Sequence, residues 1–188
     1  FPTRRSSDLN FLKRCKTSNI RVLRKNEIKK SIRDYLSSEG VLFSPYDKVF
    51  VIKKSTESKD NAIKNNIYTI LSLMGWIIWW DFPLYYYLGK KKTHTQFLLY
   101  KKSMNLTSYL WDNKSIKVVT KKSTVFRDTE LIDFEWVKLE IETPLSYIVN
   151  NIKEESENKM FIELTLRQEF EAWDIQRALL NRMNFAWI

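Results

Sequence analysis

The stretch Asn26-Glu-Ile-Lys-Lys-Ser-Ile-Arg-Asp-Tyr-Leu-Ser-Ser38 decides the N-terminal part of the fold. Its large apolar residues follow the helical repeat and share one stripe: Ile28, Ile32, Tyr35 and Leu36. We expect Asn26 to cap the N-terminus of this helix and Gly40 to end it. The lysines and Arg33 lie off the stripe, so the pattern predicts a basic face that points to solvent.

The next stretch, Val41-Leu-Phe-Ser-Pro-Tyr-Asp-Lys-Val-Phe-Val-Ile52, predicts a β-hairpin. Its flanks are rich in β-branched and aromatic residues, and Ser44-Pro-Tyr-Asp47 has the chemistry of a turn. A helix, a short stop and a basic hairpin form the second half of a winged helix, which places its helix in a DNA major groove and its hairpin along the phosphate backbone. The candidate DNA-contacting residues are Lys25, Asn26, Lys29, Lys30, Arg33, Lys48, Lys53 and Lys54.

Basic residues are concentrated in two blocks of the chain. The sequence has 188 residues and a formal net charge of +10. Residues 10–54 carry twelve Lys and Arg against four Asp and Glu, and residues 88–125 carry nine against one. Residues 126–188 are acidic, with seven basic residues against thirteen acidic ones. This placement favours an anionic partner, and the alternative is a lysine-rich genome that gives an ordinary solvated surface.

Composition excludes several classes of protein. Hydrophobic residues make up 44% and charged residues 29%, which is a globular composition and excludes wholesale disorder. The single cysteine, Cys15, excludes a disulfide scaffold, and the single histidine, His94, excludes a multi-histidine metal site. Residues 1–9 resemble a translated sequencing adapter, so we set them aside as an artefactual tail.

We expect two folded parts joined by a polar linker. Residues 10–55 would form a partial winged helix, and residues 67–188 a small mixed α/β domain. Residues 56–66 would be the linker, or a linker that starts a helix near Asp60. The expected fold class is therefore α+β.

Residues 67–88 are the most apolar part of the chain, with Asp81 as their single charge. The run is long enough to span a bilayer, and three lysines follow it, so a membrane-attached protein is one alternative. Against that alternative, Asp81 and Pro83 interrupt the run, and Trp and Tyr residues lie inside it rather than only at its ends. We expect a buried helix, a short strand at residues 76–80 and a second helix at residues 83–88.

The remaining sequence predicts strands and then helices. Residues 96–100 and 116–120 are short strand candidates, and the alternating pattern of residues 134–141 is typical of a half-buried strand. Thr143-Pro144 is expected to begin a helix, because Thr caps well and Pro suits the first turn. Residues 165–183 predict a final amphipathic helix.

Signals for catalysis are sparse. The sequence has neither a Gly-rich phosphate loop nor the Gly-Ser and paired-Asp pattern of nucleotidyltransferases. Glu157-Asn-Lys159, with Asp128 or Asp133 upstream, follows the acid…Glu-x-Lys order of metal-dependent nucleases, which makes such a nuclease the enzymatic alternative. Our main expectation is a protein with no catalytic residues, no metal and no cofactor.

In their order and spacing these segments resemble the AbiEi-like family of type IV antitoxins, over about residues 20–152. Residues 28–52 look like the closing part of that family's winged helix. Trp76-Ile-Ile-Trp-Trp-Asp-Phe-Pro-Leu-Tyr-Tyr-Tyr-Leu-Gly89 is similar to its short strand and following helix, while residues 96–102 and 116–119 resemble its next strands. Val137-Lys-Leu-Glu-Ile-Glu-Thr-Pro-Leu-Ser-Tyr-Ile-Val149 resembles its strand and the helix that follows.

The resemblance implies a cytoplasmic, two-part transcriptional regulator that acts in phage defence. The N-terminal part would bind operator DNA and repress its own operon. The C-terminal part would neutralise a cognate nucleotidyltransferase-type toxin without catalysis of its own. A second basic face, used for DNA or for an acidic partner, would consist of Lys90, Lys91, Lys92, Lys101, Lys102, Lys121 and Lys122.

Overall fold

Contacts divide the chain into two units. The computed structural model describes residues 4–46, 48–79, 81–90, 96–100, 108–112, 117–120, 128–155 and 158–167, together with residues 171, 173, 174, 176, 177 and 180. The N-terminal unit runs to Met74, and the C-terminal unit begins at Gly75. Each unit has a core of its own.

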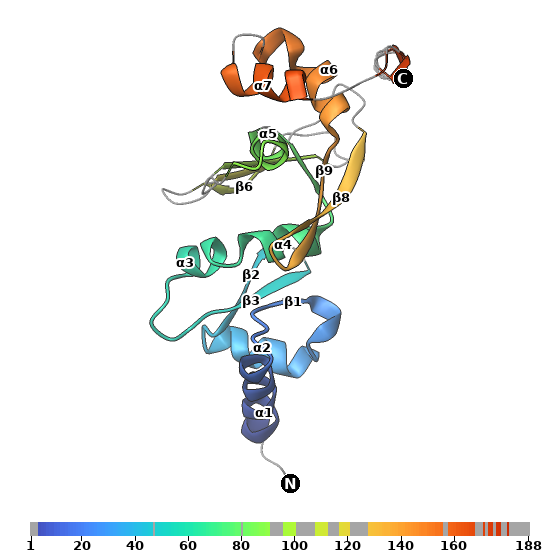
Figure 1. The fold of residues 1–188 in the computed structure, drawn as a ribbon. Coiled ribbons are helices and arrows are strands. Elements are labelled where there is room, and N and C mark those ends of the chain that lie inside the picture. Colours follow the sequence, from blue (N-terminus) through green and yellow to red (C-terminus); the bar gives the residue numbers. More distant parts are fainter. Residues whose placement is uncertain are drawn as a thin grey trace. The chain divides into compact units, whose positions relative to one another are not determined.

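The N-terminal unit is a winged helix with two added helices. Its elements are α1 (Arg4–Thr17), β1 (Val22–Arg24), the 3-10 helix η1 (Lys25–Glu27), α2 (Lys30–Ser38), β2 (Leu42–Tyr46), β3 (Val49–Ile52), α3 (Lys59–Lys64) and α4 (Ile67–Met74). Strand β3 lies between β1 and β2 and is antiparallel to both. A helix before β1, and α2 leading into the β2–β3 hairpin, give the winged-helix topology (Figure 1).

Three elements before α2 were not predicted, so the winged helix is more complete than expected. Helix α1 has a mostly polar sequence, and the apolar side chains that it contributes to the core are Phe11, Leu12 and Cys15. Its first turns belong to the tail that was set aside, but these three side chains lie beyond that tail. Burial raises the pKa of the Cys15 thiol, although nearby Arg14 acts in the opposite direction.

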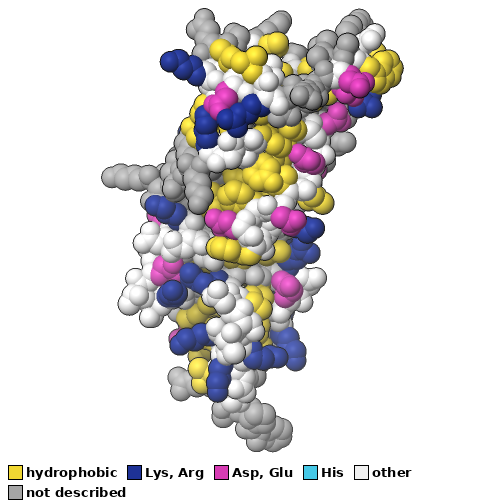
Figure 2. All heavy atoms as spheres, viewed as in Figure 1, with side chains coloured by type: hydrophobic (Ala, Val, Ile, Leu, Met, Phe, Trp, Pro, Cys, Tyr) yellow, Lys and Arg dark blue, Asp and Glu magenta, His cyan; other side chains and the backbone are white. Residues whose placement is uncertain are grey.

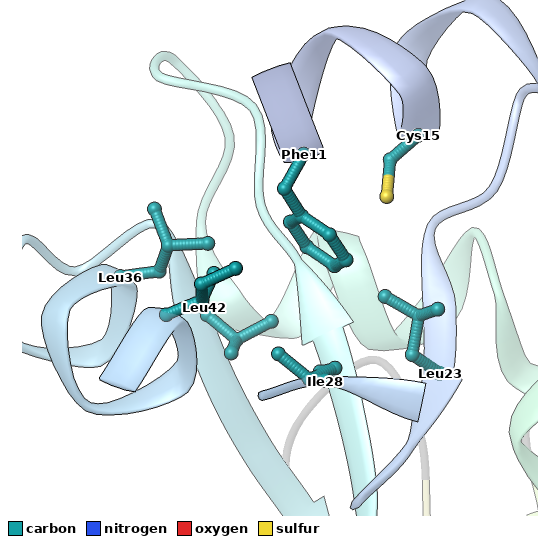
Figure 3. Packing of buried hydrophobic residues seen from close by; sticks show 7 residues of the cluster. Phe11, Cys15, Leu23, Ile28, Leu36 and Leu42 are labelled. Atoms are coloured by element: carbon teal, nitrogen blue, oxygen red, sulfur yellow. The ribbon is translucent and has the colours of Figure 1, made fainter. Parts of the chain in front are cut away.

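One cluster of buried side chains joins α1, β1, α2 and β2. Its members are Phe11, Cys15, Leu23, Ile28, Ile32, Leu36 and Leu42. Figure 3 shows Phe11 and Cys15 reaching from α1 toward Leu23 on the neighbouring strand. The predicted stripe is buried, since Ile28, Ile32 and Leu36 belong to this cluster and Tyr35 packs against it, but Ile28 lies ahead of α2, at the end of η1.

The start of α2 differs from the prediction, and its end agrees with it. Asn26 was expected as the N-cap, but it lies in η1, and α2 begins at Lys30 after Lys29 in an extended conformation. The cause of this later start is local. The Glu27 carboxylate accepts a hydrogen bond from the backbone amide of Arg24, which closes a separate turn ahead of α2. Gly40 ends the helix as predicted: its φ is +67, and its amide donates a 3.1 Å hydrogen bond to the carbonyl oxygen of Ser37.

The predicted hairpin is confirmed, but its turn lies further along the chain. Strand β2 continues through Tyr46, and Lys48, with φ 66, occupies the turn in place of the predicted Ser44-Pro-Tyr-Asp47. Pro45 is tolerated inside β2 because β2 is an edge strand, and the β2–β3 register shifts between Phe43 and Tyr46.

Helices α3 and α4 lie on the sheet, so the N-terminal unit extends further than expected. Val22 and Val51 oppose each other on β1 and β3 and are both buried, and α4 contacts both strands. Helix α3 starts at the N-cap Ser58, whose hydroxyl accepts the Asn61 amide at 3.1 Å. The alternative of a helix that starts near Asp60 is therefore confirmed, because α3 begins at Lys59, and the two units divide after Met74.

The C-terminal unit combines a mixed sheet with helices. Its elements are β4 (Ile77–Trp79), α5 (Asp81–Tyr87), β5 (Gln96–Tyr100), β6 (Ser108–Asp112), β7 (Lys117–Thr120), β8 (Thr129–Phe134), β9 (Val137–Glu142), α6 (Pro144–Glu155) and α7 (Lys159–Arg167). The strand order is β6-β7-β5-β4-β9-β8. The β4–β9 and β5–β7 pairs are parallel and the other neighbours antiparallel. The predicted α+β class is confirmed.

The apolar run of residues 67–88 is divided as predicted. It contains α4, the strand β4 and α5, with Gly75 at φ +62 after the first helix. Among the described residues, no helix is both long and apolar enough to cross a bilayer.

The helices of the C-terminal unit share one core. Helices α5, α6 and α7 contact one another, and α5 also contacts β4 (Figure 1). Their buried side chains are Leu84, Leu88, Tyr147, Ile148, Phe161 and Leu164. Pro144 is the first residue of α6, as predicted, and the Thr143 hydroxyl accepts the Ser146 amide at 3.4 Å. Helix α7 begins at Lys159, ahead of the predicted residue 165, and ends at Arg167. Of the predicted remainder to residue 183, residues 173, 174, 176, 177 and 180 are helical, residue 171 is not, and the others lie outside the described residues.

Two of the strand predictions hold and one was wrong. Strand β5 matches residues 96–100, and β7 lies within residues 116–120. The predicted strand at residues 134–141 spans the end of β8, a turn and most of β9. Glu135 has φ 54 and lies in that turn, which the continuous alternation of the sequence concealed.

Leu36→Ala should lower the free energy of unfolding by about 2–5 kcal/mol, because it leaves a cavity where a side chain is only 2% exposed. Urea denaturation followed by circular dichroism would measure the change. Ser37→Ala, at the exposed neighbouring position, is the control and should change the free energy by less than about 0.5 kcal/mol. Equal effects of the two variants would contradict the burial of the stripe.

Candidate nucleic-acid interface

The hairpin turn and η1 lie side by side. Arg24, the last residue of β1, pairs in register with Val49, the first residue of β3. One residue further, the backbone amide of Lys25 donates a 2.8 Å hydrogen bond to the carbonyl oxygen of Lys48. Both lysine side chains are exposed. Residues that were predicted on the helix and on the hairpin therefore meet at one place.

Five exposed cations lie on this junction and on the start of α2. We call them the tip cluster: Arg24, Lys25, Lys29, Lys30 and Lys48. Arg24 was missed at first because β1 was not predicted, although its position next to Lys25 was an available signal. Asn26 is also exposed, and it lies in η1 before the helix. On the visible face of the N-terminal unit, dark-blue Lys and Arg side chains are spread among magenta acids (Figure 2).

The N-terminus of α2 lies within the tip cluster. Lys29 is its N-cap residue and makes no side-chain cap hydrogen bond. The first amide groups of a helix carry a partial positive charge, which adds to the field of Lys29 and Lys30. These groups together favour the binding of a phosphate group at this junction.

Arg33 does not face solvent as expected. Its guanidinium lies over the Phe50 ring, 5.5 Å from the ring centre, and its side chain is only 13% exposed. Its Nε atom is 3.9 Å from the Asp34 carboxylate. Phe50 itself packs on the core of the N-terminal unit, so Arg33 covers the edge of that core.

Lys53 and Lys54 lie at the opposite end of β3 from the tip cluster. The amide of Lys53 donates a 2.8 Å hydrogen bond to the carbonyl oxygen of Val41, and the amide of Lys54 donates a 3.2 Å hydrogen bond to the Glu57 carboxylate. A strand of four residues separates them from Lys48, a span of about 13 Å at ~3.3 Å per residue. The structure therefore does not bring all the predicted DNA contacts together.

A partly buried ion pair fixes this opposite end of the hairpin. The guanidinium of Arg21 forms an ion pair with the Glu57 carboxylate and donates a 3.0 Å hydrogen bond to the carbonyl oxygen of Ile52. The side-chain amide of Asn65 also donates a 2.9 Å hydrogen bond to the Glu57 carboxylate. Burial alone raises the pKa of Glu57, but the hydrogen bonds from Arg21, the Lys54 amide and Asn65 outweigh it and leave that pKa below its ordinary value.

The second basic face is largely outside the described residues, which exclude Lys91, Lys92, Lys101, Lys102, Lys121 and Lys122. Lys90 is described, and its ammonium group pairs with the Glu163 carboxylate, which also pairs with Arg167. The hydrogen bond from Lys90 lowers the pKa of Glu163, although desolvation opposes it. Lys90 thus links the end of α5 to α7 within the C-terminal unit.

The residues of the nuclease alternative are not assembled in what the structure describes. Asp133 is exposed on β8, 3.9 Å from Lys138, while Glu157 lies outside the described residues. Lys159 is the first residue of α7. Among the described residues there is no group of three side chains that could hold a metal ion.

A buried polar network in the C-terminal unit was missed by the sequence analysis. Glu142, at the end of β9, is fully buried, and its carboxylate accepts hydrogen bonds of 2.8 Å from both Ser146 and Asn150 of α6. The Tyr87 hydroxyl oxygen lies 2.7 Å from the Glu142 carbonyl oxygen and 2.7 Å from the Glu130 carboxylate, so these two acceptors share its one proton. Burial, and then the Glu130 contact, raise the pKa of Tyr87. The network joins α5 and α6 to the sheet, which is a structural role.

Comparison with known proteins adds no assignment. The sequence matches no known family model. It also matches no curated protein.

Arg33→Ala should lower the free energy of unfolding by about 0.5–1 kcal/mol, because it removes the cation from the Phe50 ring. Lys30→Ala, at an exposed position of the same helix, should change the free energy of unfolding by less than about 0.5 kcal/mol. Urea denaturation of both variants makes the comparison. A loss in Lys30→Ala as large as in Arg33→Ala would contradict a packing role specific to Arg33.

Glu57→Gln should destabilise the N-terminal unit at neutral pH and flatten its acid response. Because the folded pKa of Glu57 is lowered, its stabilisation is present above the unfolded pKa of about 4.3 and is lost as pH falls through the folded value. Thermal unfolding of both proteins from pH 7 to pH 3 would show the difference narrowing on acidification. A difference that is constant over this range would show that the charge is not responsible.

Proposed function

We propose that this chain is a DNA-binding transcriptional autoregulator and antitoxin that acts in the cytoplasm without catalytic activity of its own. The observation that carries the proposal is the winged-helix topology with five exposed cations at the junction of η1, α2 and the hairpin turn. Cations in that position suit contacts with the phosphate backbone, and such contacts fix the register of a helix on the duplex.

The DNA-binding part would use α2 as its recognition helix. Its buried stripe holds it on the core, so the opposite side is free to enter the major groove. Lys29 and Lys30 at its start, and Lys48 in the hairpin turn, would contact the backbone. Lys53 and Lys54 are left out of this interface because they lie at the other end of β3.

The antitoxin part would be the C-terminal unit. Support comes from its resemblance in residues 76–89 and 137–149 to AbiEi-like antitoxins, and from its separate sheet and helical core. The partner would be a nucleotidyltransferase-type toxin encoded beside this chain. A protein made of two separately packed units suits one unit that reads DNA and one that acts on a partner.

DNA binding should weaken steeply with salt, with a log–log slope of about −0.9 for each phosphate contacted. The double variant Lys29→Ala/Lys30→Ala should reduce that slope by about 2 and weaken binding to every sequence. Fluorescence anisotropy with labelled duplexes would measure the affinity at salt concentrations from about 50 to about 200 mM, a range over which such binding changes strongly.

The matched control is Lys54→Ala/Lys64→Ala, which removes the same charge from exposed positions away from the tip cluster. It should leave the slope unchanged. An equal loss in both double variants would show that net charge, and not the tip cluster, drives binding.

The antitoxin part has a separate test. The nucleotidyltransferase encoded beside this chain is expressed alone and together with the full chain, and growth is followed. Restored growth with the chain supports the proposal, and the same growth arrest with and without it refutes the antitoxin part.

A further inference from the structure

The outward face of α2 is chemically narrow. Two of the candidate DNA-contacting residues do not lie on it, since Arg33 is packed over Phe50 and Asn26 lies in η1. Between Lys30 and Ser38, the exposed side chains of α2 are Lys30, Ser31, Asp34, Ser37 and Ser38. This face therefore carries neither of the amide side chains that read adenine, nor an arginine that reads guanine.

Asp34 occupies the middle of that face. It is one helical turn from both Lys30 and Ser31, so the three side chains project to the same side. Its side chain is 60% exposed, and its distance to the Nε atom of Arg33 is 3.9 Å, too long for a hydrogen bond. Its carboxylate oxygens thus retain capacity to accept hydrogen bonds.

A carboxylate on a DNA-facing helix has an electrostatic cost. Nearby phosphates repel it, and entry into a groove removes water from it. The cost is offset where a base edge supplies a donor. In the major groove the donors are the amino groups of cytosine and adenine. Adenine places its N7 acceptor next to its amino group, which repels a carboxylate, so cytosine is the better partner.

We propose that Asp34 reads cytosine in the major groove, with a carboxylate oxygen accepting a hydrogen bond from the N4 amino group. The inference rests on the proposed DNA-binding function and assigns the base chemistry of that site. Ser31, one turn earlier on the same face, lies where its hydroxyl reaches the neighbouring base pair or phosphate. The tip cluster then positions the helix, and Asp34 supplies the sequence preference.

The experiment begins with selection of bound duplexes from a randomised pool by the full chain. Anisotropy is then measured on the selected duplex and on versions with each base changed in turn. We expect one C·G pair whose replacement weakens binding by about 5- to 100-fold in the wild-type protein. In Asp34→Asn the preference at that pair should change to adenine, because an amide matches the N6 and N7 atoms of adenine.

Glu39→Gln is the matched control, because it removes one negative charge from the exposed C-cap position of the same helix. It should tighten binding to all sequences to a similar extent and leave the base preference intact. Thermal unfolding checks that both variants stay folded, as expected for exposed side chains.

The outcomes separate the two proposals. If the wild-type chain binds no duplex even at low salt, the proposed DNA-binding function fails, and the assignment of Asp34 fails with it. If the chain binds DNA with the expected salt dependence, but Asp34→Asn changes affinity without changing base preference, only the reading of cytosine by Asp34 is overturned.

Discussion

The burial of one helical stripe determines what the winged helix presents to solvent. Ile28, Ile32 and Leu36 pack with Phe11 and Leu23 in a single core, and each such side chain contributes about 1.5–3 kcal/mol through removal from water. Rotating α2 about its axis would expose Ile32 and Leu36, so the rotation of the helix is fixed. Every statement about its outward face, from the position of Lys30 to that of Asp34, depends on this constraint.

Local patterns explain what could be predicted from the sequence. The stripe of α2, the stop at Gly40 and the division of the apolar run into helix, strand and helix are all encoded within a few residues. The prediction errors arose where another local interaction competed with the expected one, or where the contact that decided the structure came from a distant part of the sequence. Glu27 closes a separate 3-10 turn ahead of α2, and Pro45 fits in β2 because β1, far away in sequence, takes the other side of β3.

The candidate site shows the same limit at the level of side chains. The sequence located most of the cations but could not show their partners. Arg33 lies over Phe50, and Lys90 pairs with Glu163. Both pairings depend on tertiary contacts, which no periodicity reports. Conversely, the contact between η1 and the hairpin turn brought Arg24 into the tip cluster through a strand pairing that the sequence alone did not suggest.

Pro45 has a consequence for the behaviour of the protein at high concentration. Strand β2 is an edge of the three-stranded sheet, where an unpaired row of amides invites another chain to add a strand. Pro45 has no amide to offer, and the irregular register beside it bends the strand. The opposite edge, β1, is only three residues long. Both features oppose the edge-to-edge pairing through which open sheets associate.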